Sequence, residues 1–321
     1  MKTLALVVPC YNEQEVLPYF YEETSKVIAA LSEQYRTELV FVDDGSRDRT
    51  LQILKDLAMR DPAVKYISFS RNFGKEAAML AGMEYAVKAD FIGILDADLQ
   101  HSPDLIPEML RYITEEGYDV AAAKRSDREG EGKFKSFLSG SFYKVINRIS
   151  DIEISQSAQD FRVMRQDVVK AILSMPENIR FSKGIFTWVG FNVKWIDHKN
   201  RERAAGDTKW SIRKLAKYAI DGILGYTSSP LRLSFFCSFV TILCAAICLI
   251  YGIVRVCIDH TYNATLPFVL TAVFFVGAVI LFCIGILGEY LARVYTEVKD
   301  RPKYIIAQTN TLKNTILDKE F

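Results

Sequence analysis

Two aspartates, Asp96 and Asp98, are the residues whose type and spacing most clearly suggest chemistry. They follow the apolar run Phe91–Leu95, which predicts a buried strand, and an amide comes two residues later. Residues i and i+2 of an extended chain point the same way, so both carboxylates can converge on one cation where the strand opens into a loop. Hard oxygen ligands suit Mg²⁺ or Mn²⁺, which keep coordination positions for substrate phosphates. The alternative is an ordinary solvated turn.

The segments that must position these carboxylates alternate between strand and helix over residues 1 to about 125. This alternation predicts an α/β fold with a mainly parallel sheet and helices on both faces. Pro18 marks an early turn or kink in the first helix, and Asp48 or Thr50 is expected to cap the second. The predicted strands are Leu4–Val8, Leu39–Val42, Tyr66–Phe69, Phe91–Leu95 and Val120–Ala123, and the predicted helices are Glu13–Leu31, Thr50–Met59, Lys75–Val87 and Ile106–Thr114.

Polar clusters follow four successive predicted strands. Ligands of parallel sheets bind beyond the carboxyl ends of the strands, so these clusters are expected to form one site. An Asp-Gly-Ser sequence is also ordinary turn chemistry, and such a turn can present a carboxylate to a ligand. The four clusters are Pro9–Glu13, Asp43–Ser46, Arg71–Lys75 and Asp96–Asp98.

Two long uncharged segments, Leu233–Val254 and Thr261–Gly288, lie in the last third of the chain. Each can cross a hydrocarbon core of about 30 Å. Basic residues before the first segment and after the second predict a multi-pass protein of the cell membrane with both termini and the catalytic domain cytoplasmic. The predicted transmembrane helices are 231–257 and 266–291, joined by a short external loop, 258–265.

The remaining chain is divided around these helices. Residues 1–208 are predicted to form the cytoplasmic domain and 292–321 a cytoplasmic tail. Basic and apolar residues at helical spacing in 209–230 predict an amphipathic helix in the membrane interface, followed by a linker. The 321 residues carry a formal net charge of +1, so no overall basic surface indicates nucleic acid binding.

The combined motifs resemble glycosyltransferase family 2, whose fold (GT-A-like) binds a nucleotide sugar and a divalent metal. Within this family, the motifs most resemble those of the polyisoprenyl-phosphate glycosyltransferases, the group that includes dolichol-phosphate mannose synthase. The bacterial members with two membrane spans, which transfer glucose or N-acetylhexosamine to undecaprenyl phosphate, match best. The resemblance covers nearly the whole chain. It rests on Val8–Glu13, Asp43–Ser46, Arg71–Lys75, Asp96–His101, Asp160–Arg162 and Arg203–Trp210.

The resemblance implies a role for individual residues. Asp96, Asp98 and Gln100 would hold Mg²⁺ or Mn²⁺, and Asp43 would accept a hydrogen bond from the base. His101 is expected to be a structural neighbour, and Trp188 and Trp195 to be packing residues. The implied nucleotide-sugar contacts are Pro9, Tyr11, Asn12, Glu13, Asp43, Asp44, Phe73, Gly74, Lys75, Asp96 and Ala97; the acceptor phosphate would meet Arg125, Lys135 and Ser139; the catalytic set is Asp98, Asp160, Arg203 and Lys209.

Two departures from the family pattern affect these assignments. Lys135 stands where relatives hold the lipid phosphate with an arginine, which gives a point charge in place of a fork. Relatives often carry an acidic residue where this chain has Ser157, so the catalytic acidic role is either missing or has moved to Asp160. A phosphate acceptor is already anionic at pH 7, so the site mainly needs cations rather than a general base.

The predicted function is therefore inverting transfer of a hexose or N-acetylhexosamine from a nucleotide sugar, UDP-linked in preference to GDP-linked, to a polyprenyl phosphate at the cytoplasmic membrane face. The lipid-linked sugar would serve cell-envelope glycan modification, and relatives suggest a homo-oligomer among membrane lipids. One alternative is a processive polysaccharide synthase, although the chain lacks the Gln-x-x-Arg-Trp motif. Another is a non-catalytic membrane subunit that keeps nucleotide binding.

Overall fold

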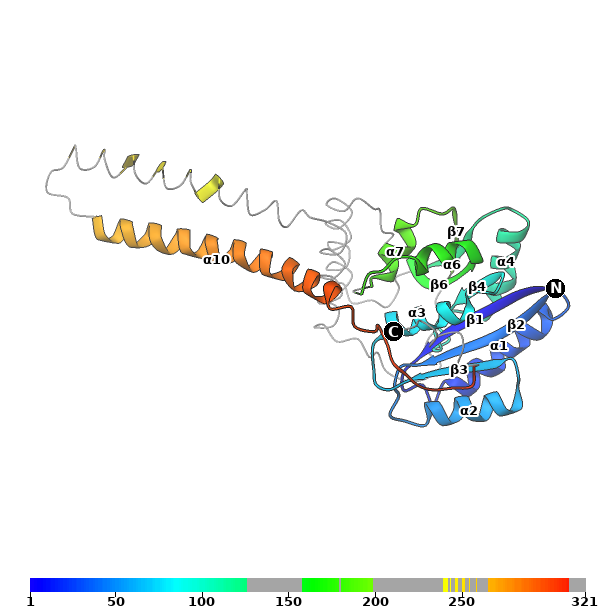
Figure 1. The fold of residues 1–321 in the computed structure, drawn as a ribbon. Helices are drawn as coiled ribbons and strands as arrows, with labels where there is room; N and C mark the ends of the chain where they lie inside the picture. The colour runs from blue at the N-terminus through cyan, green and yellow to red at the C-terminus, as the bar shows by residue number, and fades with distance from the viewer. Residues whose placement is uncertain are drawn as a thin grey trace.

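The computed structural model describes residues 1–125, 158–178, 180–198 and 265–311, together with isolated positions between 239 and 258. Strands and helices alternate through the first part, as Figure 1 shows. The strands are β1 (Lys2–Cys10), β2 (Tyr35–Asp43), β3 (Val64–Phe69), β4 (Phe91–Ile94), β5 (Val120–Arg125), β6 (Ala158–Arg165), β7 (Val193–His198) and β8 (Ile306–Thr309). The helices are α1 (Leu17–Leu31), α2 (Thr50–Arg60), α3 (Lys75–Ala86), the 3₁₀ turn η1 (Pro103–Leu105), α4 (Ile106–Thr114), α6 (Gln166–Leu173), α7 (Ser182–Trp188) and α10 (Thr265–Val298).

These strands form one sheet in the order β7-β5-β6-β4-β1-β2-β3-β8. Strands β4, β1, β2 and β3 are parallel neighbours, and β5 pairs with β7 in parallel. Strand β6 runs antiparallel between β4 and β5, and β8 runs antiparallel to β3. The predicted α/β fold with a mainly parallel sheet is confirmed. The antiparallel β6 brings residues 158–165 beside the strand that precedes Asp96.

Helices cover both faces of the sheet because the central strands are apolar on both sides. Leu4, Leu6 and Val8 of β1 pack with α1, α2 and α4, whereas Ala5 and Val7 pack with α3, α6 and α7. Alternate residues of a strand point to opposite faces, so continuous apolar runs produce two cores. These cores hold the strand ends in place.

Most predicted boundaries hold within a few residues, and the structure differs from the sequence-based expectations at a helix start, a helix cap and two tryptophans. Helix α1 begins at Leu17 rather than Glu13, and Pro18 lies in its first turn, where a missing N–H is tolerated. Asp48 accepts a hydrogen bond from the Thr50 backbone, but the residue at the cap position of α2 is Arg49. Trp188 and Trp195, expected to be packing residues rather than sugar platforms, are 60% and 38% exposed, so Trp188 lies outside the core and Trp195 packs only in part.

Helix α10 is an apolar rod that projects away from the sheet (Figure 1). Its 34 residues extend about 51 Å, and Phe275–Val298 is long and apolar enough to cross a membrane. Leu281 and Leu287 on this helix are more than half exposed, as expected of a lipid-facing surface. The helix continues past 291, where the predicted span ends. The predicted span 231–257, the loop 258–265 and the interfacial segment 209–230 lie wholly or largely outside the described residues.

The chain after α10 returns to the sheet. Residues predicted as a cytoplasmic tail form strand β8 on the edge of β3, with Ile67 opposite Thr309 and Ser68 opposite Gln308. Asn310 extends this attachment, because its side chain accepts a hydrogen bond from the Tyr66 backbone and donates one to the Val64 carbonyl. The sheet of the amino-terminal domain is therefore completed by the carboxy-terminal segment.

Candidate active site

The loops that leave β1, β2, β3 and β4 contain left-handed backbone conformations. Asn12, Gly45, Gly74 and Leu99 have φ values of 53°, 65°, 102° and 55°. At Gly45 a side chain is excluded for a second reason, because a Cβ would lie 2.4 Å from the backbone carbon of Arg71. The loop after β2 therefore packs directly on the loop after β3, and the predicted clusters meet at one end of the sheet.

The adjacent carboxylates at the end of β2 have separate partners. Asp43 is buried and accepts hydrogen bonds from the Ser46 backbone (3.0 Å) and the Ser68 hydroxyl (2.7 Å). Asp44 accepts bonds from the backbone N–H groups of Phe73 (2.6 Å) and Gly74 (2.9 Å). Burial raises the pKa of Asp44 to about 6, although these backbone bonds oppose the rise. Asp44 thus fixes the loop before α3.

The loop after β1 is tied to the loop after β2. The Asn12 backbone donates to Ser46 Oγ at 2.9 Å, and the Asn12 side chain accepts a bond from the Arg47 backbone at 2.9 Å. The Glu13 backbone donates to the hydroxyl of Thr50, at the start of α2. Pro9 is half-buried at the end of β1. These contacts give the predicted nucleotide-binding residues of this loop a fixed position.

A cavity of about 410 Å³ opens between these loops. Its lining is mainly polar backbone and side chains, with the buried Asp43 carboxyl among them. It is large enough for part of a nucleotide, at the edge of the site farthest from β6. Its lining residues are Tyr11, Asp43, Gly45, Ser46, Arg47, Leu51, Ser68, Phe69, Ser70, Arg71, Asn72, Ala307 and Gln308.

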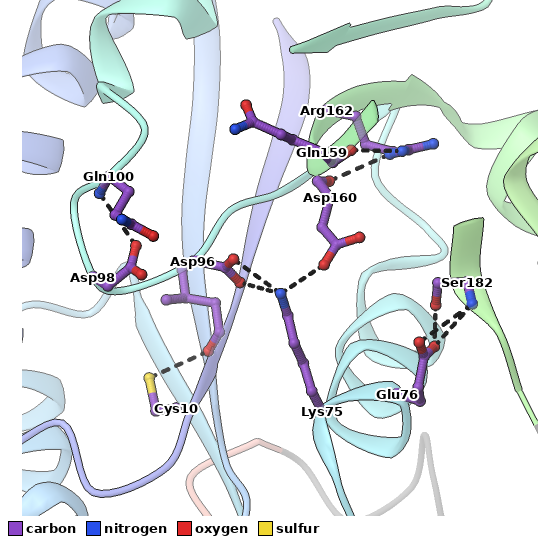
Figure 2. Close-up of polar contacts among 11 residues, drawn as sticks. Cys10, Lys75, Glu76, Asp96, Asp98, Gln100, Gln159, Asp160, Arg162 and Ser182 are labelled. Atoms are coloured by element: carbon purple, nitrogen blue, oxygen red, sulfur yellow. Dashed lines mark hydrogen bonds and ion pairs between the residues drawn. The ribbon is translucent and has the colours of Figure 1, made fainter. Parts of the chain in front are cut away.

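A second centre lies at the ends of β4 and β6, where a lysine bridges two carboxylates (Figure 2). Lys75 Nζ lies 2.7 Å from Asp96 Oδ1 and 2.6 Å from Asp160 Oδ2. Burial opposes the lysine charge, but Asp160 and Asp96 outweigh it and raise the pKa of Lys75. Despite burial, Lys75 holds the pKa of Asp160 well below its usual range. Asp96 and Asp160 therefore share one cation, the ammonium of Lys75.

Asp98 and its neighbours form the loop beyond Asp96. Asp98 Oδ1 accepts a hydrogen bond from the Gln100 backbone at 3.1 Å, which closes a tight turn. Ala97 and Leu99 are buried, so this turn is anchored by its apolar residues. His101 is also buried, with its ring 5.6 Å from that of Phe161, and burial lowers the pKa of its imidazole.

Glu76 is a polar residue of the site that sequence reasoning missed. Its carboxyl accepts hydrogen bonds from the Ser182 backbone, and the Ser182 hydroxyl also contacts it (Figure 2). Burial raises the pKa of Glu76 to about 7. The sequence offered one sign of this role, since Glu76 directly follows Lys75 at the start of α3. Its partner Ser182, however, lies 106 residues away in the chain. The contact joins α3 to α7 beside the carboxylate pair.

The donor set fits a divalent ion. Asp96 and Asp98 supply hard oxygen atoms, and Lys75 Nζ contacts both oxygen atoms of Asp96, so a metal ion would share Asp96 with this ammonium. Within the described residues, no group of three or more His, Cys, Asp or Glu side chains is arranged to enclose a metal. An ion held by Asp96, Asp98 and Gln100 would therefore complete its shell with water and substrate phosphate, as Mg²⁺ commonly does.

The predicted acceptor side is described only in part. Arg125 is the last residue of β5, paired in register with His198 of β7, so its backbone lies in the sheet. Lys135, Ser139, Arg203 and Lys209 lie outside the described residues. Their roles toward the acceptor phosphate stay predictions.

Comparison with known proteins gives two sequence-family matches. Residues 5–173 match Glycosyl transferase family 2, and residues 229–294 match the GtrB C-terminal hairpin. The second match covers both predicted spans.

Individual relatives extend over nearly the whole chain. Identity is 39% over 307 residues to the putative glycosyltransferase CsbB of Bacillus subtilis (strain 168), covering 96% of this chain and 92% of that protein. It is also 39% over 310 residues to a bactoprenol glucosyl transferase of Shigella phage SfII, covering 96% and 98%. Among solved structures, glucosyl-3-phosphoglycerate synthase from Mycobacterium tuberculosis, in complex with Mn²⁺ and UDP-glucose, has a TM-score of 0.46 at 15% identity, covering 70% of this chain and 77% of that one.

Proposed function

The chain belongs to glycosyltransferase family 2, in its polyprenyl-phosphate glycosyltransferase branch, and from this premise we propose that it transfers glucose from UDP-glucose to undecaprenyl phosphate. Glucose is the first sugar to test because the SfII relative is named a bactoprenol glucosyl transferase. Another hexose or an N-acetylhexosamine remains within the proposal. The transfer takes place on the cytoplasmic face of the membrane and inverts the anomeric carbon.

The observation that carries this proposal is the juxtaposition of two chemically different centres at one end of the sheet. The cavity beside Asp43 offers hydrogen-bonding groups for a nucleoside, and the Lys75–Asp96–Asp160 cluster offers charge for a diphosphate. Parallel strands β2, β1 and β4 fix the spacing between them. A nucleotide sugar is a ligand with these two parts in this order.

The acceptor chemistry matches the ionisation of the site. An oxygen of the lipid phosphate attacks the anomeric carbon, the bond from that carbon to the diphosphate oxygen breaks, and no proton must be removed. Asp160 would be a poor general base, because its ion pair with Lys75 lowers its pKa. Its role in the proposal is to hold Lys75 beside Asp96 at the position of the sugar and diphosphate.

A divalent ion bound by Asp96, Asp98 and Gln100 would stabilise the negative charge that develops on the departing nucleoside diphosphate. The protein's own contribution is to hold these oxygen atoms in a fixed turn, with the backbone of Gln100 bonded to Asp98. The proposed cations for the acceptor phosphate are Arg125, Lys135, Arg203 and Lys209, together with Ser139.

Helix α10 supports a membrane-bound acceptor. Its apolar, exposed surface suits lipid, and its carboxy-terminal end contacts the catalytic domain, where Glu297 accepts hydrogen bonds from the backbone and side chain of Asn178. The helix therefore keeps the site close to the lipid surface. We propose that the lipid phosphate enters from that side.

The test is transfer from radiolabelled UDP-glucose by a membrane fraction supplied with undecaprenyl phosphate and Mn²⁺. A chloroform-soluble product that depends on the added lipid is expected. The absence of a lipid product with any common nucleotide sugar would overturn the proposal. A polymer formed without added lipid phosphate would instead indicate a processive synthase, and nucleotide binding without turnover would indicate a non-catalytic subunit.

A further inference from the structure

The segment after the membrane helix reaches the cavity of the candidate active site. Strand β8 pairs with β3, and two of its residues, Ala307 and Gln308, line the cavity beside Asp43. The rest of the described lining comes from the loops and strands of the first 72 residues. One wall of this cavity is therefore supplied by a segment more than 200 residues farther along the chain.

The register of the strands sets the direction of the Gln308 side chain. Asp43 of β2 is paired with Ser68 of β3, and Ser68 is paired with Gln308 of β8. Paired residues on neighbouring strands point to the same face of a sheet. Since Ser68 donates its hydroxyl to Asp43 Oδ2, that face is the one with the Asp43 carboxyl. Asp43, Ser68 and Gln308 thus form a polar row across three adjacent strands.

The three members of this row differ in what they can offer a ligand. Asp43 uses one lone pair on each oxygen, for Ser46 and Ser68, so it can still accept a bond from a ligand N–H. Gln308 is exposed, and within the described residues its amide has no hydrogen-bond partner. An amide provides both N–H donors and a carbonyl acceptor. The row matches a planar ring with an N–H flanked by carbonyls, the edge that uracil presents.

The position of β8 is fixed by contacts on both sides. Before it, the Tyr304 ring stacks on Phe69 with centroids 4.9 Å apart, and its hydroxyl contacts Glu84 on α3. After it, the Asn310 side chain bonds the backbone of β3. Gln308 is therefore held on an ordered strand, and its amide needs little additional ordering to meet a ligand.

We propose that β8 is part of the nucleotide-binding site and that the Gln308 amide hydrogen-bonds the base of the donor nucleotide, beside the carboxylate of Asp43. This inference rests on the proposed function, because it assumes that the cavity takes the nucleoside of a nucleotide sugar. It makes Gln308 a specificity-determining residue and the carboxy-terminal segment a working part of the catalytic domain.

The experiment uses the full chain in detergent micelles and compares wild type with Gln308→Ala and the control Gln34→Ala. Gln34 is an exposed amide just before β2, at the opposite end of that strand. UDP binding is measured by calorimetry with Mn²⁺, and KM and kcat with UDP-glucose and undecaprenyl phosphate. Loss of one neutral hydrogen bond should weaken UDP binding and raise KM by about 3- to 10-fold, with kcat within about twofold.

Other outcomes distinguish a failure of the Gln308 inference from a failure of the proposed function. UDP binding by Gln308→Ala equal to that of wild type and Gln34→Ala would overturn the inference. Gln308→Glu should weaken UDP binding further, because a carboxylate would face a base carbonyl. An unchanged melting temperature of the Gln308 variants would show that strand β8 stays in place. A wild-type protein that binds UDP but makes no lipid product overturns the proposed function alone, and the UDP titration of the variants still decides the inference.

Discussion

The site contains two pairs of aspartates, and the two pairs differ in what they bind. At the end of β2, Asp43 and Asp44 accept hydrogen bonds from backbone N–H groups and hydroxyls. At the ends of β4 and β6, Asp96 and Asp160 both contact the ammonium of Lys75. The first pair accepts hydrogen bonds from neutral donors, and the second pair contacts a cation.

Under the proposed function, this difference suits the two halves of a nucleotide sugar. Neutral donors leave the β2 end suited to an uncharged ring, because Asp43 keeps lone pairs available and accepts hydrogen bonds from a backbone N–H and a hydroxyl. The β4–β6 end concentrates negative charge beside the cation of Lys75, and we propose that a metal ion and a diphosphate bind there. Variants at each end should therefore fail in different ways.

The largest difference is expected between Asp98→Ala and Asp43→Ala. Loss of Asp98 would remove a proposed metal ligand at the proposed diphosphate end, so kcat should fall on the order of 10³-fold. Loss of Asp43 would remove the proposed contact to the base, so KM for UDP-glucose should rise about tenfold with a smaller change in kcat. Steady-state transfer to undecaprenyl phosphate measures both. Equal losses of kcat in the two variants would contradict the division into two centres.

An intermediate effect is expected from Lys75→Met, which leaves Asp96 and Asp160 without their cation. The charges are partly exposed, with the Lys75 side chain 33% exposed, so the folded state should lose about 1–3 kcal/mol rather than the full cost of a buried pair. Added Mn²⁺ should raise the melting temperature of Lys75→Met more than that of wild type. Lys75→Arg is the matched control, since it keeps the charge. A variant with unchanged stability and no Mn²⁺ response would show that the Lys75 ion pairs do not stabilise the folded protein.

A third effect, seen only as pH is varied, concerns the Glu76–Ser182 contact beside this cluster. Burial raises the pKa of Glu76 from 4.5 to about 7, so between these values the folded protein binds a proton that the unfolded chain has released. Stability should then fall as pH rises from about 4.5 to about 7. Melting temperatures of wild type and Glu76→Gln across this range test the point. The variant should show a flatter profile, and an identical slope would assign the pH dependence to other groups.

The strand ends of the site could be predicted from the sequence because their signals are local. An apolar run followed by polar residues marks both the strand and the end that faces the ligand, as with Phe91–Leu95 before Asp96. The parallel core of the sheet follows from the same alternation of strands and helices. Asp43, Asp96 and Asp98 were placed at one edge for this reason, and the structure brings their loops together.

The pairings between distant segments could not be predicted. Lys75 and Asp160 were each expected in the site, but the chain gives no sign that residues 85 positions apart form an ion pair. Strand β8 is only four residues long and has no apolar pattern of its own. It forms because β3 offers an unpaired edge and because Tyr304 and Asn310 fasten the segment there. Such contacts depend on tertiary structure rather than on local propensity.

The position of β8 at the end of the chain affects how the nascent protein folds. Since β8 follows α10 along the chain, the ribosome makes the strand that covers β3 only after the long apolar helix. An uncovered strand edge is a template for pairing with other chains, and domains generally fold from the amino terminus during translation. The amino-terminal domain therefore exposes the free edge of β3 to pairing with other chains until the ribosome has made α10 and β8.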